Sequence, residues 1–157
     1  MSRQATGGEA ASQPARRPVL LSRTVMLGYA DTDPAGILYY AAWFPKMENL
    51  QSEFLFRQGM RQDTLKETQG WWTVTRATEC EYLVAARLYD EIRIELRIGE
   101  IRTSSFSFAF EMRRTSDEVL VARASLTLVA VSPDQSAVRM PDSLREQLEA
   151  WATTGGR

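Results

Sequence analysis

Two aspartates, a proline and a glycine stand close together in residues 29–40, which read YADTDPAGILYY. Asp31 and Asp33 are separated by one residue, Pro34 directly follows the second, and Gly36 comes three residues after it. This pattern fits three roles. Asp before Pro often starts a turn or caps a helix, a pair of carboxylates can bind a metal ion, and a carboxylate beside a helix N-terminus can act on a carbonyl carbon.

The third role has a physical basis. The first amides of a helix have no acceptors within it, and together with the positive end of the helix dipole they can stabilise a carbonyl oxygen that becomes an oxyanion. A carboxylate at Asp33 can then attack the carbonyl carbon or deprotonate a water. Gly36 allows the backbone to approach a bound group closely. These parts are enough to cleave an activated acyl bond such as a thioester.

The sequence has no histidine and one cysteine, Cys80, which narrows the chemistry. Nucleophiles that depend on a histidine base are excluded, as are zinc sites with histidine ligands. We expect Cys80 to be a small buried hydrophobic residue, because nothing near it in the sequence lowers the pKa of its thiol. Asp31 and Asp33 lack further oxygen ligands close by, so we expect no metal and no cofactor.

The neighbours of the motif predict the elements that hold it. Residues 19–29 alternate as a strand does, and Asp-Pro-Ala-Gly suits a type I turn. A helix should follow at once, up to Arg57 with Gly59 beyond its end, so that Asp33 lies just before a helix N-terminus. Pro45 leaves two possibilities: the main helix begins near it after a short turn at residues 37–42, or the helix bends there. The apolar face of this helix consists of Tyr40, Phe44, Met47, Leu50, Phe54 and Leu55.

Long strands are predicted after Gly70. In one of them Ile92, Ile94, Leu96 and Ile98 point inward and alternate with Arg93, Glu95 and Arg97, and residues 105–112 alternate in the same way. Burial of one face only is typical of antiparallel sheets. Residues 63–70 form a short helix or a loop, and residues 143–151 a last helix capped by Ser143 with Glu146. The order predicts an α+β fold in which a curved antiparallel sheet of about five strands wraps one central helix.

The chain has 157 residues, the size of one domain, and 44% of them are hydrophobic. The net charge of -1 argues against nucleic acid as a partner, and no apolar run is long enough to span a membrane. We expect residues 1–18 to be a disordered arm without the apolar segment of a secretory signal, and residues 153–157 to be a flexible tail. A single cysteine fits a reducing compartment, so we expect the protein in the cytoplasm.

Residues 28–59, GYADTDPAGILYYAAWFPKMENLQSEFLFRQG, together with the strands that follow, resemble the 4-hydroxybenzoyl-CoA thioesterase family of hot-dog folds. The resemblance covers roughly residues 25–141 and depends on the motif D-x-D-x-x-G. It implies a hot-dog thioesterase domain over residues 19–152. It also implies that Asp33 is the catalytic nucleophile or general base, that the backbone N–H of Tyr40 is the oxyanion donor, and that Asp31 and Gly36 support the loop.

The same resemblance implies a homodimer with a continuous sheet, commonly assembled into a homotetramer, with active sites between the subunits. Tyr39, Trp72 and Thr73 are the candidate residues of the substrate pocket. Trp43 either lines it or packs between subunits.

The chain departs from the family in several places. Ala42-Trp43 stands where relatives often have Asn-Tyr, and the turn that carries a basic cluster in CoA-binding relatives holds one positive charge here. The candidate contacts to CoA or phosphopantetheine are Arg102, Thr103 and Ser104. From the resemblance we expect an acyl-CoA hydrolase acting on an aryl or medium-chain acyl group. An acyl-carrier-protein thioesterase that releases a polyketide or fatty acyl chain and a non-catalytic acyl-CoA-binding protein are the alternatives.

Two carboxylates on the predicted helix are further candidates for the acid. We expect Glu53 to pair with Arg57 one turn later and Glu48 to be solvated, so neither is expected to be catalytic.

Overall fold

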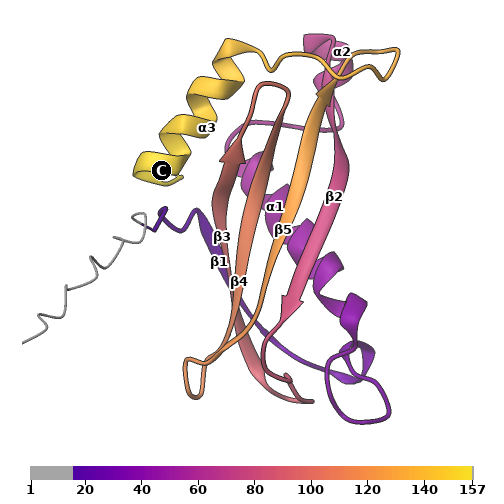
Figure 1. Ribbon diagram of the computed structural model, residues 1–157, viewed down its shortest axis with the longest axis vertical. Coiled ribbons are helices and arrows are strands. Elements are labelled where there is room, and N and C mark those ends of the chain that lie inside the picture. The colour runs from indigo at the N-terminus through magenta and orange to yellow at the C-terminus, as the bar shows by residue number, and fades with distance from the viewer. Residues whose placement is uncertain (1–15, 157) are drawn as a thin grey trace, which may run out of the picture.

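The computed structural model describes residues 16–156, so residues 1–15 of the predicted disordered arm lie outside the described part. One sheet of five strands dominates the fold, and all neighbouring strands are antiparallel (Figure 1). Its spatial order is β1-β3-β4-β5-β2. The predicted α+β architecture, in which one long helix lies against an antiparallel sheet, is confirmed. The strands are β1 (Leu21–Met26), β2 (Trp72–Tyr82), β3 (Glu91–Ile101), β4 (Ser105–Arg114) and β5 (Leu120–Val131).

The long helix α1 (Trp43–Arg57) follows a three-residue 3₁₀ turn, η2 (Tyr40–Ala42). Pro45 is the third residue of α1, within the first turn, where its missing N–H costs no helical hydrogen bond. The first of the two predicted possibilities is therefore correct. The helix ends as predicted, because Gly59 takes a left-handed φ of 78° just beyond it.

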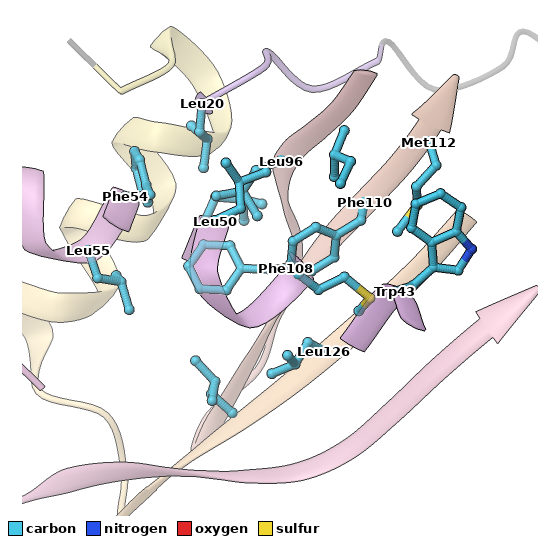
Figure 2. Close-up of a cluster of buried hydrophobic side chains, with 14 of the residues drawn as sticks. Leu20, Trp43, Leu50, Phe54, Leu55, Leu96, Phe108, Phe110, Met112 and Leu126 are labelled. Carbon is cyan, nitrogen blue, oxygen red and sulfur yellow. The ribbon is translucent and has the colours of Figure 1, made fainter. Parts of the chain in front are cut away.

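The core forms where the apolar face of α1 meets the inner faces of β3 and β4 (Figure 2). Phe54 contacts Phe108 edge to face, with ring centroids 6.2 Å apart. The predicted alternation along β3 is confirmed, since Ile92, Ile94, Leu96 and Ile98 are all buried. Arg97 is also buried although it faces the other side of the sheet, because residues 16–18 run across it and its Nε donates to the backbone oxygen of Arg17 at 3.0 Å.

Strand β2 is an edge strand that pairs only with β5. Most of its residues are exposed on both faces. Such a long uncovered edge is rare in a monomer, because it offers unpaired backbone groups to another strand.

Two further helices lie near the C-terminal end of α1. The short α2 (Leu65–Gln69) ends at Gly70, which has a φ of 74°. The last helix, α3 (Asp142–Thr154), begins one residue before Ser143 and continues past Trp151. The predicted Ser143 cap is wrong: Pro141 enters in extended geometry, the helix starts directly after it, and no side chain caps the end. Within residues 16–156, no helix is long and apolar enough to cross a membrane.

Replacing Trp151 by Ala should destabilise the whole chain. Trp151 is 3% exposed and lies edge to face on Phe54 of α1, with ring centroids 4.8 Å apart. Truncation of such a residue should lower the free energy of unfolding by about 3–5 kcal/mol in one cooperative transition, measured by denaturant unfolding. The exposed Glu149→Ala on the same helix is the matched control. A separate early transition would show that α3 is not part of the same cooperative unit.

Candidate active site

A tight hairpin carries the aspartate motif. Thr32 and Leu38 pair as an antiparallel bridge, the N–H of Gly36 donates to the carbonyl of Asp33 at 2.9 Å, and the N–H of Asp33 donates to the carbonyl of Ile37 at 3.0 Å. The predicted turn at Asp-Pro-Ala-Gly is confirmed. Gly36 has a φ of 74°, and no atom lies within 4 Å of the place its Cβ would take. Glycine suits this left-handed backbone, and its predicted close approach to a bound group stays a prediction.

The hairpin also corrects the predicted position of Asp33. The helix α1 does not follow the aspartate directly; the chain first turns back, so that the N–H of Tyr39 donates to the carbonyl of Asp31 at 3.1 Å. Tyr40 then opens the turn η2, where the first N–H has no acceptor within the helix. Asp33 and Tyr40 therefore reach the same region through strand-like pairing of the chain and not through a helix that begins directly after Asp33.

Asp33, Tyr39 and Tyr40 line one pocket of about 460 Å³. Its other walls are almost entirely apolar, and Asp33 is the only carboxylate among the residues that line it. An apolar cavity with a few convergent polar groups is typical of a small-molecule site. The remaining lining residues are Ile37, Leu38, Trp43, Tyr82, Leu83, Val84, Ala85, Ala86 and Val121.

The two aspartates of the motif have different surroundings. Asp31 accepts from Nζ of Lys46 at 2.6 Å and from the N–H of Gly28 at 2.9 Å. Partial burial raises the pKa of Asp31, but the hydrogen bonds from Lys46 and Gly28 and the charge of Lys46 outweigh it, so the net shift is downward. Asp33 is partly buried and accepts the N–H of Ala35 through Oδ1 at 2.8 Å. Asp31 is neutralised by a cation, whereas Asp33 opens into the pocket.

Several predicted site residues lie at the far end of the sheet. Trp72 and Thr73 begin β2, whereas Tyr82 at its other end lines the pocket. Ten steps along a strand span roughly 33 Å, far beyond the reach of a side chain. The turn between β3 and β4 lies at the same distant end, because Ser105 is paired to Val129 near the end of β5. Within one chain, the structure therefore separates Trp72, Thr73, Arg102, Thr103 and Ser104 from Asp33.

Some pocket residues were not predicted as part of the site. Tyr82, Leu83 and Val84 reach the pocket from the end of β2 and the loop after it. Their position depends on long-range strand register, for which a local pattern gives no signal. Trp43 is 1% exposed in the single chain, so it belongs to the core and the pocket wall and does not pack between subunits.

The remaining candidates lie outside the pocket. Glu53 pairs with Arg57 at 2.5 Å as predicted, and it also pairs with Arg23 of β1. Glu48 is exposed, as predicted. Cys80 is only partly buried, and desolvation raises the pKa of its thiol, which keeps it protonated at neutral pH. In the part of the chain from 16 to 156, no three His, Cys, Asp or Glu side chains gather as metal ligands would.

Comparisons with known proteins identify the fold and the family of the chain. Residues 27–148 match the family model of the Thioesterase-like superfamily. Solved structures with the same fold include Slr0204, a 1,4-dihydroxy-2-naphthoyl-CoA thioesterase from Synechocystis, with a TM-score of 0.70, 16% identity, and 81% of this chain and 93% of that chain covered. SAV2348 from Staphylococcus aureus, solved in complex with CoA, has a TM-score of 0.74 and 13% identity, with 90% and 88% covered. The fold is the hot-dog fold of thioesterases.

The family follows from the sequence match. The chain belongs to the Thioesterase-like superfamily, and its class is that of thioesterase enzymes. Curated relatives include an acyl-CoA thioesterase YbgC of Haemophilus influenzae, 28% identical over 107 residues that cover 68% of this chain and 77% of the relative. An acyl-CoA thioester hydrolase YbgC of Escherichia coli O6:H1 is 28% identical over 109 residues, which cover 69% and 80%.

Replacing Lys46 by Met should destabilise the protein at neutral pH, because Asp31 would keep its charge in a partly buried position without its cation. We expect a loss of about 1–3 kcal/mol at pH 7. A lowered folded-state pKa stabilises the protein above the ordinary value of 3.8, and this contribution is lost as the pH falls through the folded-state pKa. The difference between wild type and variant should therefore shrink below about pH 3.8.

Denaturant unfolding across this pH range measures the effect. Glu100→Gln is the control, since it breaks the exposed ion pair with Arg102 and should leave stability nearly unchanged. A Lys46→Met loss that is equal at all pH values would show that packing of the lysine stem, and not its charge, stabilises the loop.

Proposed function

We propose that this protein hydrolyses acyl-CoA thioesters, with an aryl or medium-chain acyl group in the apolar pocket. One observation carries the proposal: Asp33 and Tyr40, the first residue of η2, line the same pocket. The names of the curated relatives and the CoA bound to a structural neighbour support CoA as the carrier. We further propose that the reaction takes place in the cytoplasm.

In the proposed mechanism, the thioester carbonyl lies between Asp33 and the start of η2. Asp33 either attacks the carbonyl carbon or deprotonates a water that does so. The backbone N–H of Tyr40 stabilises the oxyanion of the tetrahedral intermediate. The C–S bond then breaks, the CoA thiolate leaves, and water supplies the new oxygen of the carboxylic acid. Tyr39 contributes to the wall, and Asp31 and Gly36 hold the loop.

The carrier of the acyl group is a separate question. Arg102 is ion-paired to Glu100 at 2.7 Å, so the turn with Thr103 and Ser104 offers little net positive charge for phosphates. This observation favours the alternative that an acyl carrier protein delivers the acyl group on a phosphopantetheine arm. A non-catalytic acyl-CoA-binding protein is the alternative from another class, and an accessible carboxylate in the pocket argues against it.

We also propose that the active unit is a homodimer, joined through the uncovered edge of β2 and assembled further into a tetramer. Antiparallel pairing of two β2 edges would place the beginning of one strand beside the end of the other. Trp72 and Thr73 of the partner subunit would then approach the pocket that contains Asp33. The turn that holds Arg102 lies at the same end of the sheet as Trp72, so it would be supplied from the partner side as well.

Replacing Asp33 by Asn should lower kcat/KM by about 10²-fold or more, because the amide keeps the shape but is neither base nor nucleophile. The substrates are benzoyl-, hydroxybenzoyl-, hexanoyl- and lauroyl-CoA, each compared with the same acyl group on an acyl carrier protein. Asp63→Asn, an exposed aspartate paired to Arg61 outside the pocket, is the matched control and should retain full activity. Wild type that cleaves no thioester, or an Asp33→Asn variant with full activity, would contradict the proposal.

Complementation tests the proposed shared site. Asp33→Asn and Trp72→Ala should each be impaired as homodimers. Co-expressed with different tags and purified through both tags, the heterodimer has one site with both residues intact and should regain about half of the wild-type activity per dimer. Activity no greater than the mean of the two variants would show that Trp72 does not serve a pocket across the interface.

A further inference from the structure

Tyr82 is the last residue of β2, and it connects the sheet to the oxyanion turn. Its hydroxyl donates a hydrogen bond to the backbone carbonyl of Tyr40, and its side chain lines the pocket that contains Asp33. We propose that Tyr82 is a positioning residue, which holds η2 so that the N–H of Tyr40 points at the substrate carbonyl. This inference rests on the proposed thioesterase function and adds a residue to its machinery.

The Tyr40 end of η2 is held less firmly than its other end, where Ala42 is buried. The turn has only three residues and no side-chain cap. The side chain of Tyr40 is 73% exposed, so core packing contributes little to holding the residue in place. A hydrogen bond to the carbonyl of Tyr40 restrains the same residue whose N–H is the proposed oxyanion donor. Small displacements of such a donor are costly for catalysis, because its geometry must match the transition state.

The other end of this hydrogen bond is rigid. Tyr82 is paired to Ala122 in the ladder between β2 and β5, and Ala122 is 1% exposed. The hydrogen bond therefore ties a surface turn directly to the sheet. The residue is separated from Tyr40 by a long stretch of chain, so only the folded state brings the two together.

The phenol acts in this position as a neutral donor. Partial burial and the neighbouring Cys80 thiol raise the pKa of Tyr82 to about 12. A hydroxyl has one hydrogen to donate, and here it is given to the carbonyl of Tyr40. Tyr82 is thus neither the base nor the direct oxyanion donor, and its effect on the reaction passes through the backbone of Tyr40.

Replacing Tyr82 by Phe tests the proposal, since the ring stays and only the hydroxyl is lost. We expect kcat to fall by roughly tenfold or more while KM stays within about twofold. The reason is that the hydrogen bond from the Tyr40 N–H to the substrate oxygen becomes stronger in the transition state than in the bound substrate. The melting temperature should change little. Tyr89→Phe is the matched control: Tyr89 contacts Tyr29 edge to face outside the pocket and should keep wild-type kcat and KM.

Vibrational spectroscopy measures the stretching frequency of the thioester carbonyl, which would not change if Tyr82 had only a structural role. A thioester labelled with ¹³C at the carbonyl is bound to Asp33→Asn, which stops turnover, with and without Tyr82→Phe. Polarisation by the Tyr40 N–H lowers the carbonyl stretching frequency, so loss of the hydroxyl should shift the band back toward its value in water. An unchanged band, or a raised KM with unchanged kcat, would overturn the proposal and leave Tyr82 as pocket wall.

The positioning role of Tyr82 can be tested even without thioesterase activity. If wild type hydrolyses no thioester, ¹⁵N-tyrosine labelling still tests the hydrogen bond, because the chain has 5 tyrosines and their amides can be assigned by substitution. The Tyr40 amide should shift and exchange faster with solvent in Tyr82→Phe, and should be unchanged in Tyr89→Phe. An unmoved Tyr40 amide would refute the positioning role whatever the reaction is.

Discussion

Burial of one face of α1 against the inner face of the sheet is the interaction on which the position of the pocket depends. Trp43 and Phe54 are 1% and 2% exposed, at the beginning and near the end of the helix. Burying each such side chain is worth about 1.5–3 kcal/mol or more. Because the first residue of α1 is already part of the core, the turn η2 just before it is anchored on its C-terminal side. The pocket is formed where this anchored turn meets the aspartate hairpin.

The uncovered edge of β2 is the second constraint. Its backbone groups and side chains are left accessible, while its other edge is paired to β5 with one bulge at Arg76. One end of this strand lines the pocket, and the other end carries Trp72. In a single chain these two ends lie far apart. An interface along β2 would cover an aggregation-prone edge and complete the wall of the pocket in one step.

The two aspartates of the motif differ in their surroundings, and this difference distinguishes their proposed roles in a protein without histidine. Asp31 and Asp33 are two residues apart and chemically identical, yet one is neutralised by Lys46 and the other opens into an apolar pocket. The ion pair of Asp31 stabilises the hairpin, and the hairpin presents Asp33. Asp33 accepts the N–H of Ala35 and lines the pocket, where it is the proposed base or nucleophile of a site without histidine.

Local patterns in the sequence were sufficient for much of the fold. The alternation of Ile92 to Ile98, the helix end at Gly59 and the turn at Gly36 were all predicted, because each depends on residues that are neighbours along the chain. The beginning of α3 was mispredicted at Ser143, since Pro141 in extended geometry started the helix directly after it. Arg97 was expected on an outward face and is nonetheless covered, because distant residues 16–18 lie across it.

The sequence by itself identified the motif, the family resemblance and Asp33 as the candidate carboxylate. Only the tertiary structure decided that Asp33, Tyr40 and Tyr82 line one pocket, and that Trp72 and Arg102 are at the opposite end of the sheet. The physical reason is that periodicity reports which face a residue occupies, whereas proximity across a sheet depends on register between strands that are far apart in the chain.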